Sequence, residues 1–367
     1  MSPQDPLRVG IVGAGVISSE YLENLTAFPG LDVAFVADLD LERAREQAQA
    51  HRVRASGSVD DLLSRDEIDL VVNLTIPAAH VAVTRAALHA GKHVWVEKPF
   101  ALDLASGRSL LDEAHRLGLR IGSAPDTFLG AGLQTALRTI AADGIGTPLT
   151  ALAVMQSPGP DLWHPHPEFL FQEGAGPLFD IGPYYFTALV QALGPARRVM
   201  ATSATARPIR TVRSGPRAGT EFPVTVPTHH GGLIEFEGGA SAQFLLSFQS
   251  HLKRAGVLEI AGTHGTLVLP DPNAFHGDST LYDDAHPSGK IIAASGVTST
   301  RGIGVAELAQ SIRDGRRARA SGEQALHVLD IMSAIAESAD ERRPVLVEST
   351  CEPQMALPET WDPRRPR

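Results

Sequence analysis

The first third of the chain alternates short apolar runs with stretches in which apolar residues recur every three or four positions. This alternation predicts strands and amphipathic helices in βαβ units, which build a parallel sheet. The expected strands span residues 8–14, 32–38, 69–75, 93–99 and 120–125, and the expected helices span 18–28, 41–51, 79–91 and 103–118. We therefore predict a doubly wound, parallel α/β domain over residues 1–126.

The pattern changes after about residue 126, where short runs of strand-forming residues dominate and Gly- and Pro-rich turns separate them. Such runs are typical of an antiparallel sheet. The expected strands span 149–157, 232–239, 241–250, 257–270 and 290–297, and the expected helices span 130–143, 180–194, 304–315 and 324–340. Residues 127–367 are therefore predicted to form an α+β domain with a large, mostly antiparallel sheet. Packing of the late helices on the first domain is left open as an alternative.

The composition suits two packed domains. A chain of 367 residues with 43% hydrophobic and 20% charged residues is long and apolar enough for two cores. A net charge of −10 without a Lys- or Arg-rich run disfavours a nucleic acid partner. The sequence shows no leader-like N-terminal segment and no apolar run of ~18 residues, so we expect a cytoplasmic protein without a membrane partner. Its one cysteine, Cys351, cannot form an internal disulfide.

A glycine-rich turn joins the first expected strand to the first expected helix. It reads Gly13-Ala14-Gly15, and Ser18 stands where the G-x-G-x-x-G pattern has its third small residue. Backbone N–H groups at the start of such a helix bind a pyrophosphate, because the helix dipole favours negative charge there. The turn therefore predicts a dinucleotide site in a Rossmann domain. Its candidate contacts are Gly13, Gly15, Val16 and Ile17.

The second expected strand ends at Asp38, where a carboxylate binds the ribose hydroxyls of a dinucleotide. A carboxylate at this place repels the 2′-phosphate of NADP, so the sequence favours NAD over NADP. Asp40 is expected to cap the next helix. Arg43 and Arg45 lie on that helix and are expected to be solvated, although contact with a phosphate is an alternative.

The fourth expected strand ends in Glu97-Lys98-Pro99. Ligands of open α/β sheets bind at the carboxyl ends of the strands, so Lys98 is predicted to face a cleft. A paired, exposed strand ending is the alternative interpretation.

Three segments of the chain, 10–18, 74–101 and 174–194, resemble the glucose–fructose oxidoreductase, inositol dehydrogenase and rhizopine-catabolism (Gfo/Idh/MocA) family. The resemblance covers nearly the whole chain. It implies that Lys98 orients the substrate hydroxyl and the nicotinamide, and that a cis peptide bond precedes Pro99. The further cofactor contacts that it implies are Thr75, Pro77, His80, Glu97 and Lys98.

The family's second motif, D-x-G-x-H-x-x-D, begins here at Asp180 and has Tyr184 at the histidine position and Thr187 in place of the last Asp. Some members of the family carry a tyrosine there. By this resemblance Tyr184 is the catalytic acid/base, and Lys98 is the group expected to lower its pKa. Asp180 is a candidate substrate contact or proton acceptor. Tyr185 is expected to pack instead.

A Pro-rich loop between the two motifs contains Trp163, His164 and His166. An aromatic face suits the C–H surface of a sugar and imidazoles suit its hydroxyls, so these three are candidate substrate contacts; a role in capping the loop is the alternative. Two histidines without acidic or cysteine neighbours do not predict a metal site, and none is expected. Asp126 resembles a residue that borders the family's active-site cleft, with a helix N-cap as the alternative.

The expected reaction moves a hydride between a nicotinamide and a secondary alcohol of a sugar, glycoside or cyclitol, with Lys98 and Tyr184 handling the proton. An NAD-dependent glycoside hydrolase that oxidises its substrate transiently needs the same residues and is the first alternative. A nucleotide-sensing protein without chemistry is the second. The resemblance also implies a homodimer or homotetramer that forms through the C-terminal sheet. The particular sugar and its reacting carbon are left open.

Overall fold

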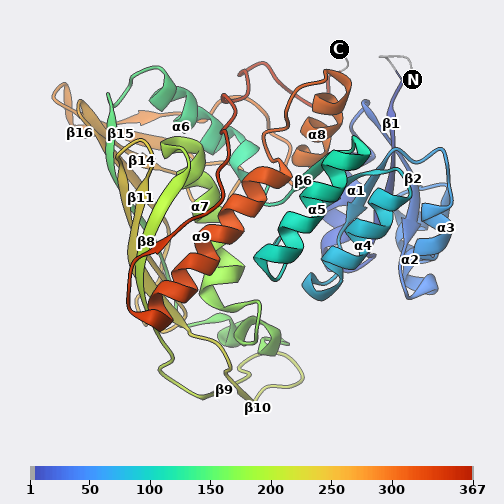
Figure 1. Ribbon diagram of the computed structural model, residues 1–367, viewed down its shortest axis with the longest axis horizontal. Coiled ribbons are helices and arrows are strands. Elements are labelled where there is room, and N and C mark those ends of the chain that lie inside the picture. Colours follow the sequence, from blue (N-terminus) through green and yellow to red (C-terminus); the bar gives the residue numbers. More distant parts are fainter. Residues whose placement is uncertain (1–4, 366–367) are drawn as a thin grey trace. The chain divides into compact units, whose positions relative to one another are not determined.

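The computed structural model describes residues 5–365, and the chain forms two compact units (Figure 1). The first unit comprises the chain up to Gly130, together with Gly296–Leu326 and the segment that starts at Gln354. The second comprises Ala131–Ser295 and His327–Pro353. Among the described residues, no helix is both long and apolar enough to cross a membrane.

The first unit contains a parallel sheet of six strands in the order β3-β2-β1-β4-β5-β6. The strands are β1 (Leu7–Val12), β2 (Leu31–Ala37), β3 (Ala55–Gly57), β4 (Leu70–Asn73), β5 (His93–Val96) and β6 (Ile121–Ser123). The helices are α1 (Val16–Leu25), α2 (Leu41–Ala50), α3 (Val59–Leu63), α4 (Pro77–His89), α5 (Leu104–Leu117) and α8 (Ile303–Arg313), with the short η1 (Thr127–Leu129) after β6. The predicted Rossmann sheet is confirmed.

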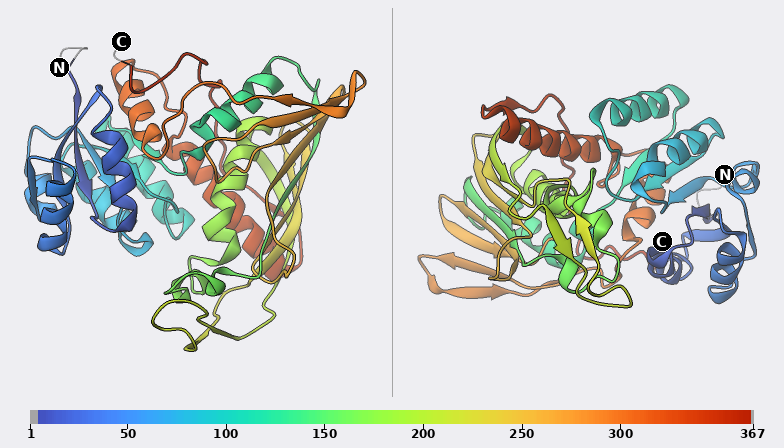
Figure 2. Two further views of the ribbon diagram at one scale, coloured as in Figure 1. Left: turned by 180° about the vertical axis from the view of Figure 1, so that it is seen from behind. Right: turned by 90° about the horizontal axis from the view of Figure 1, so that it is seen from below.

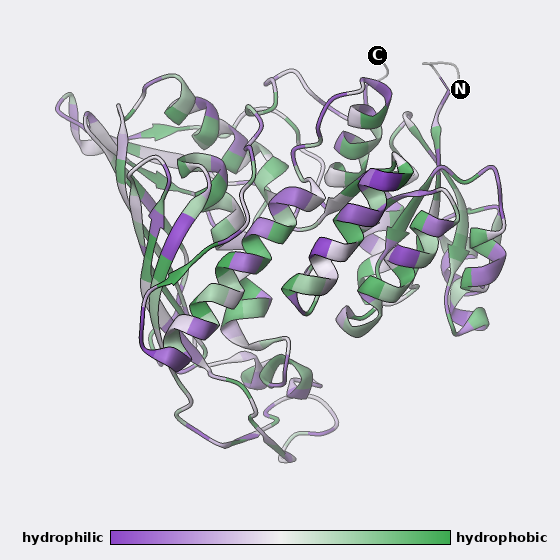
Figure 3. Cartoon of the chain, viewed as in Figure 1, coloured by the Kyte–Doolittle hydropathy of each residue, from purple (hydrophilic) through white to green (hydrophobic). Residues whose placement is uncertain are grey.

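The central strands of this sheet are buried along their length, as expected where helices cover both faces. All four residues of β4 are buried, and Val94, Trp95 and Val96 of β5 are each 0% exposed. In Figure 3 the helices of this unit carry purple, hydrophilic residues, as α2 does, on the surface that they present in this view. The short β3 was not predicted, because its three residues, Ala-Ser-Gly, contain no apolar run.

The second unit contains a mixed sheet of nine strands in the order β16-β15-β14-β13-β7-β12-β11-β8-β17 (Figure 2). All neighbours are antiparallel except β7 and β12, which run parallel, so the predicted mostly antiparallel sheet is confirmed. The strands are β7 (Pro148–Gln156), β8 (Ala196–Ala204), β11 (His229–Phe236), β12 (Ser241–Ser247), β13 (Arg254–Gly262), β14 (Gly265–Leu269), β15 (Ser279–Asp283), β16 (His286–Ile292) and β17 (Val345–Leu346).

Smaller elements complete the second unit. Helices α6 (Ala131–Ala141) and α7 (Gly176–Leu193) belong to it, and α9 (Gly322–Glu341) runs from the first unit into the second. A separate two-stranded sheet joins β9 (Ile209–Thr211) to β10 (Glu221–Pro223), and two short helical turns, η2 (Pro160–Leu162) and η3 (Glu168–Phe171), lie between β7 and α7. Strand β8 was not predicted, since Arg197 and Arg198 interrupt its apolar pattern.

The register of the large sheet separates a buried face from an open one. Helix α7 packs against β7, β11 and β12 on the buried face. One row of paired residues on that face consists of Val199, Ile234, Ala242, Ala151, Ile260, Leu267 and Leu281, all buried. The adjacent positions point to the other face, because successive strand residues alternate. That row runs through Met200, Leu233, Gln243 and Leu152.

Candidate active site

Three segments with predicted site residues meet at one edge of the six-stranded sheet. Strands β1, β4 and β5 are parallel neighbours, so the residues that follow them lie at the same carboxyl edge. Gly13 follows β1, Thr75 follows β4, and Glu97 and Lys98 follow β5. This is the edge at which open α/β sheets bind ligands.

The turn after β1 leaves room for a ligand that the protein itself does not fill. Gly13 has φ of +102°, and a Cβ there would lie 2.7 Å from the Leu74 carbonyl oxygen, so the chain itself requires glycine. Gly15 has an ordinary φ of −75°, and a Cβ there would meet nothing within 4 Å. The fold itself therefore does not require glycine at this position. No side chain caps α1, which leaves its N-terminus suited to a pyrophosphate.

The residues around this turn fit the same interpretation. Val16 is 97% exposed at the first position of α1, and Ile17 is half-buried. Ser18 is fully buried and its hydroxyl donates to the Gly15 carbonyl over 2.6 Å, so the small residue expected at this position does allow helix and strand to pack closely. Leu39 after β2 and Ile76 after β4 are 96% and 69% exposed, and they offer apolar surface at the same edge.

Asp38 ends β2 and is already held by three donors. Its Oδ2 accepts from the Ala14 N–H over 2.7 Å, and its Oδ1 accepts from the Asp40 N–H over 2.9 Å and from Arg43 Nη2 over 2.6 Å. Burial acts to raise the pKa of Asp38, but these hydrogen bonds outweigh it and hold the pKa below its usual value. Arg43 is exposed, as expected, and its guanidinium also pairs with Asp38. Asp40 caps α2 as predicted.

Helix α4 begins at Pro77, and the loop before it is fixed by Asn73. Thr75 donates from its hydroxyl to Asn73 Oδ1 over 2.6 Å, and Asn73 Nδ2 donates to the His80 carbonyl over 3.1 Å. His80 is 1% exposed, with its ring between the Pro99 and Thr75 carbonyl oxygens at 2.7 and 3.0 Å. Burial lowers the pKa of His80, so the neutral ring donates to one of them. Within this unit His80 joins the loops after β4 and β5.

Glu97 is a buried carboxylate whose two oxygens both accept hydrogen bonds. Tyr21 of α1 donates from its hydroxyl to Glu97 Oε1 over 2.8 Å, and the Lys98 N–H donates to Oε2 over 2.9 Å. Trp95 Nε1 in turn donates to the Tyr21 oxygen over 3.1 Å. Burial, followed by the charges of Glu97 and Asp126, raises the pKa of Tyr21, which therefore remains a donor. The Lys98–Pro99 bond is cis, as the resemblance implied.

Asp126 lies in the interior of the first unit. It is 0% exposed, and its Oδ2 accepts from the N–H groups of Gly302 and Gly304 over 2.8 and 3.2 Å, at the start of α8. Arg301 Nη1 lies 4.0 Å from Asp126 Oδ1 and 3.9 Å from Glu97 Oε1. The carboxylate thus caps α8 rather than its own η1. These contacts occupy the group that was predicted to bind substrate and leave it no exposed surface.

The second unit carries the other catalytic candidates on α7. Asp180 and Tyr184 are four residues apart and therefore share one face of the helix. Asp180 is half-buried and Tyr184 is 7% exposed. Tyr185 points into the sheet, where its hydroxyl accepts from the Gly256 N–H over 2.8 Å, so the expected packing role is confirmed.

The Pro-rich loop presents its candidates at the surface of the same unit. Trp163 and His166 are exposed and His164 is half-buried. His164 Nδ1 accepts from the His166 N–H over 3.0 Å, so the neutral ring carries its proton on Nε2 and offers a donor there. Within residues 5–365, no three His, Cys, Asp or Glu side chains cluster as a metal ion requires.

Tyr21, Asn73 and Arg301 also belong to this site, although the sequence did not indicate them. Tyr21 fits the apolar stripe of its helix, and only the need of buried Glu97 for a donor indicates it. Arg301 follows a long stretch of the other unit, and no local pattern connects it with Glu97. Asn73 was predicted as a strand residue only. A polar residue within a buried strand does, however, indicate a structural or functional role.

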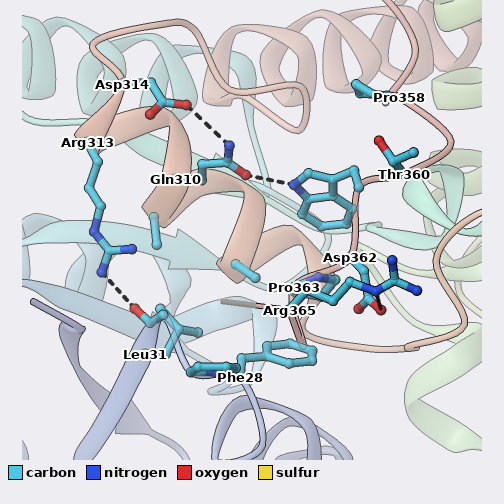
Figure 4. A pocket seen from close by; sticks show the side chains of 15 residues that line it. Phe28, Leu31, Gln310, Arg313, Asp314, Pro358, Thr360, Asp362, Pro363 and Arg365 are labelled. Atoms are coloured by element: carbon cyan, nitrogen blue, oxygen red, sulfur yellow. Dashed lines mark hydrogen bonds and ion pairs between the residues drawn. The ribbon is translucent and has the colours of Figure 1, made fainter. Parts of the chain in front are cut away.

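A cavity of about 860 Å³ lies elsewhere in the first unit (Figure 4). It adjoins Leu31, the first residue of β2, and is therefore at the amino edge of the sheet rather than at the ligand edge. Trp361 lines it and donates from Nε1 to Gln310 Oε1 over 2.7 Å, while Arg313 donates to the Gly30 carbonyl over 2.7 Å. None of the predicted site residues lines this cavity.

A glycine cradle at an uncapped helix, a carboxylate after the second strand and a lysine after β5 define a dinucleotide-dependent enzyme of the Rossmann class. The family model for the oxidoreductase family with an NAD-binding Rossmann fold matches residues 7–124, and the GFO/IDH/MocA C-terminal domain matches residues 133–268. The chain belongs to the Gfo/Idh/MocA family of NAD(P)-dependent oxidoreductases.

Individual relatives agree with this assignment. Trans-1,2-dihydrobenzene-1,2-diol dehydrogenase of Bos taurus is 29% identical over 314 residues, which cover 84% of this chain and 88% of the relative. Inositol 2-dehydrogenase 3 of Saccharopolyspora erythraea is 26% identical over 271 residues, covering 72% and 74%. The solved apo structure of levoglucosan dehydrogenase matches with a TM-score of 0.83 at 21% identity, over 95% of this chain and all of that one, and supports the fold alone.

Asp126 should make stability depend on pH. Burial is the largest cause that raises its pKa, from 3.8 to about 6. A raised pKa means that the folded state favours the protonated form, so this contribution is present below about pH 4 and is lost as pH rises through about 6. We expect a loss on the order of 3 kcal/mol in the free energy of unfolding. Urea unfolding of wild type and Asp126→Asn over this range measures it.

The asparagine variant keeps an acceptor for the α8 amides and removes the charge, so its stability relative to wild type should rise with pH. Asp112→Asn, at an exposed position of α5, serves as the control and should show a constant difference. A constant difference for Asp126→Asn as well would contradict the raised pKa.

Proposed function

We propose that the protein is an NAD-dependent dehydrogenase of a sugar, glycoside or cyclitol, acting on a secondary alcohol. One observation carries the proposal: the open cradle at Gly15 and the Glu97–Lys98 pair lie at the same carboxyl edge of one sheet. Family membership supplies the oxidoreductase class. The named relatives act on a diol and a cyclitol, which supports a polyhydroxylated substrate.

The residues present fit a dinucleotide. The N–H groups at the start of α1 suit the pyrophosphate, and Asp38 suits a ribose. The exposed Val16, Leu39 and Ile76 suit apolar parts of the cofactor. We assign Gly13, Gly15, Val16, Ile17, Asp38, Thr75, Pro77, Glu97 and Lys98 to this site, and His80 to holding its loops. When bound, the nicotinamide accepts the hydride.

Lys98 and Tyr184 are the proposed proton-handling groups. The Lys98 N–H donates to Glu97, and this hydrogen bond fixes the backbone from which the Lys98 side chain extends at the sheet edge. Tyr184 exchanges a proton with the substrate hydroxyl, and Asp180, one turn earlier on α7, binds a neighbouring hydroxyl. Trp163, His164 and His166 bind the rest of the substrate. The Nε2–H form of His164 makes it a hydrogen-bond donor rather than a base.

The first test mixes the protein with NAD and a panel of sugars, cyclitols and glycosides, and records nicotinamide absorbance and released aglycone together. We expect sustained NADH formation with at least one member and no aglycone release. Aglycone release that requires NAD but yields no net NADH would identify the redox-assisted hydrolase instead. If the protein binds NAD but neither NADH nor aglycone forms, the result would favour a nucleotide-sensing protein.

Variants then test the assigned residues with the substrate that this panel identifies. Lys98→Ala and Tyr184→Phe should each lower kcat by roughly 100-fold or more, the usual scale for a positioned acid or base. Tyr282→Phe removes a partly exposed hydroxyl from β15 and is the matched control. Unchanged turnover in both active-site variants would exclude these assignments.

Asp38 should set the preference for NAD over NADP. A carboxylate after the second strand of a Rossmann sheet repels the 2′-phosphate of NADP, so Asp38→Asn should reduce the ratio of NADPH to NADH dissociation constants by about tenfold. Fluorescence titration of the reduced nicotinamides measures both constants without any substrate. Asp40→Asn removes the same charge two residues away and keeps an adequate helix cap, so it should leave the ratio nearly unchanged. An equal shift in both variants would mean that Asp38 has no special contact.

We also propose that the protein forms a homodimer or homotetramer through the open face of the large sheet. Met200 and Leu152 are 56% and 37% exposed on that face, in a row that also contains the exposed Gln243, and apolar side chains exposed on an open sheet face favour self-association. The double variant Met200→Glu/Leu152→Glu should therefore be monomeric in light scattering. Leu117→Glu, at an exposed position of α5, is the control. A wild-type monomer would contradict the proposal.

A further inference from the structure

Two segments of the second unit leave the large sheet and pack on one another. The platform loop, residues 157–175, contains η2 and η3, and the strap, residues 205–228, contains β9 and β10 (Figure 1). The Arg213 N–H donates to the Asp161 carbonyl over 2.9 Å, and the Thr225 N–H donates to the Phe171 carbonyl over 3.0 Å. Backbone hydrogen bonds from the strap thus hold the loop at two separate points.

The strap also places one arginine inside the loop. Arg210 is 4% exposed, and its Nη1 donates to Asp161 Oδ1 over 2.5 Å and to the Pro158 carbonyl over 2.9 Å. Its Nη2 donates to the Phe248 carbonyl over 2.5 Å, so one guanidinium joins the loop to the end of β12. Gly159 has φ of +121°, and a Cβ there would collide with this guanidinium. The close approach therefore depends on both residues.

The presence of this buried pair is weak evidence for stability, because desolvation of the two ions offsets much of their attraction. Removal of one partner would nevertheless leave the other charge buried and unpaired. The geometry imposed here is that of the platform loop. A second pair acts in the same direction, because Arg217 of the strap lies 2.5 Å from Glu168 Oε1 and 3.5 Å from His166 Nδ1.

Between these attachments the loop exposes three neighbouring rings. Trp163 and His164 meet edge to face with centroids 5.5 Å apart, and His164 and Phe169 do so at 5.4 Å. Trp163 is 68% exposed and Phe169 is 55% exposed. Large aromatic side chains that stay exposed on a well-anchored loop mark a recognition surface. We call these three residues the ring cluster.

The ring cluster belongs to the same unit as the polar candidates. The η3 turn, which contains Phe169, packs against α7, the helix that carries Asp180 and Tyr184. The rings offer flat apolar faces, with His164 Nε2–H as a hydrogen-bond donor. Hydroxyl-binding groups and a ring-binding surface are therefore separate features of one unit.

We propose that the ring cluster selects substrates that carry a second ring, and that Arg210 is the positioning residue that holds the cluster for this purpose. The inference rests on the proposed function, because it takes Asp180 and Tyr184 to bind the reacting part of the substrate. The recognised chemistry is an apolar ring face, which stacks on Trp163 and Phe169. An aromatic substituent and the C–H face of a second sugar both supply it.

Three β-glucosides that differ only in their substituent test the selection: methyl glucoside, phenyl glucoside and cellobiose. The better of the two ring-bearing compounds should have a kcat/KM about tenfold above that of methyl glucoside, as expected for one or two aromatic contacts. Trp163→Ala should bring the ratio close to one. If the ratio of the two kcat/KM values is unchanged in Trp163→Ala, the proposed role of the ring cluster is wrong, while the proposed function stands. Preference for phenyl glucoside or for cellobiose identifies the source of the ring.

Tryptophan fluorescence gives a readout that needs no turnover. Of the three tryptophans in the chain, Trp95 and Trp361 are 0% and 8% exposed, so acrylamide quenches mainly Trp163. With NAD present, phenyl glucoside or cellobiose should lower the quenching constant, and methyl glucoside should not. Shielding without turnover supports the ring cluster even where the proposed function fails. No shielding by either ring-bearing compound overturns it.

Variants of the strap test the positioning role. Arg210→Met should raise KM for the ring-bearing glucosides by about tenfold and change kcat by less than about twofold, since only the ring contact is misplaced. Arg210→Lys keeps the charge beside Asp161 and should recover part of the loss. Arg207→Met changes an exposed arginine of the strap and should have no effect.

Arg210→Lys also keeps the test decisive where Arg210→Met does not fold. If KM for methyl glucoside and KM for the ring-bearing glucosides rise equally in Arg210→Lys, Arg210 supports the fold without selecting substrates. That result would overturn its role as a positioning residue.

Discussion

The buried carboxylate of Glu97 is the constraint on which the ligand edge of the first unit depends. An ionised group in the interior is tolerated only when its oxygens are hydrogen-bonded and a countercharge is near. Tyr21 and the Lys98 N–H satisfy the two oxygens, and Arg301 lies 3.9 Å away. The same contacts define where the chain leaves β5, and hence where the Lys98 side chain begins. The backbone of Lys98 is thus held at the ligand edge by the hydrogen bond from its N–H to Glu97.

This arrangement also explains why a late segment of the chain belongs to the first unit. Arg301 comes just before α8, and Asp126 receives the N–H groups at the start of that helix. Without residues 296–326, Glu97 would lose its countercharge and Asp126 would lose its donors. The segment is thus required by buried charge as well as by apolar packing. The parallel sheet forms the core of this unit, and the buried charges of Glu97 and Asp126 determine that residues 296–326 pack in it.

The sequence alone predicted those features of the fold and of the candidate site that depend on a local pattern of residues. The period of the apolar residues predicted five of the six parallel strands, and the strand–glycine–helix order predicted the cradle at Gly13 and Gly15. Partners that lie far apart in the chain were missed, because no periodicity connects them. Tyr21 is 76 positions from Glu97, and Gly302 is 176 positions from Asp126. Asp126 shows the difficulty best: its surroundings resembled an active-site border, yet its carboxylate is turned inward to cap a helix that the sequence does not place beside it.

The buried charges of the two units hold different kinds of structure in place. This difference determines at which residues substrate specificity can change. The network around Glu97 is shared among three elements of the core, so a substitution there affects the fold and the cofactor edge together. The Asp161–Arg210 pair joins the platform loop to the strap, both at the surface. The residues that it holds in place, Trp163 and Phe169, contribute little to any core. Substitutions among those rings can therefore alter what is recognised without disturbing the sheet. In this chain the residues at the ligand edge and the exposed rings of the loop therefore belong to separate networks, so that the rings can change while the hydrogen bonds around Glu97 stay in place.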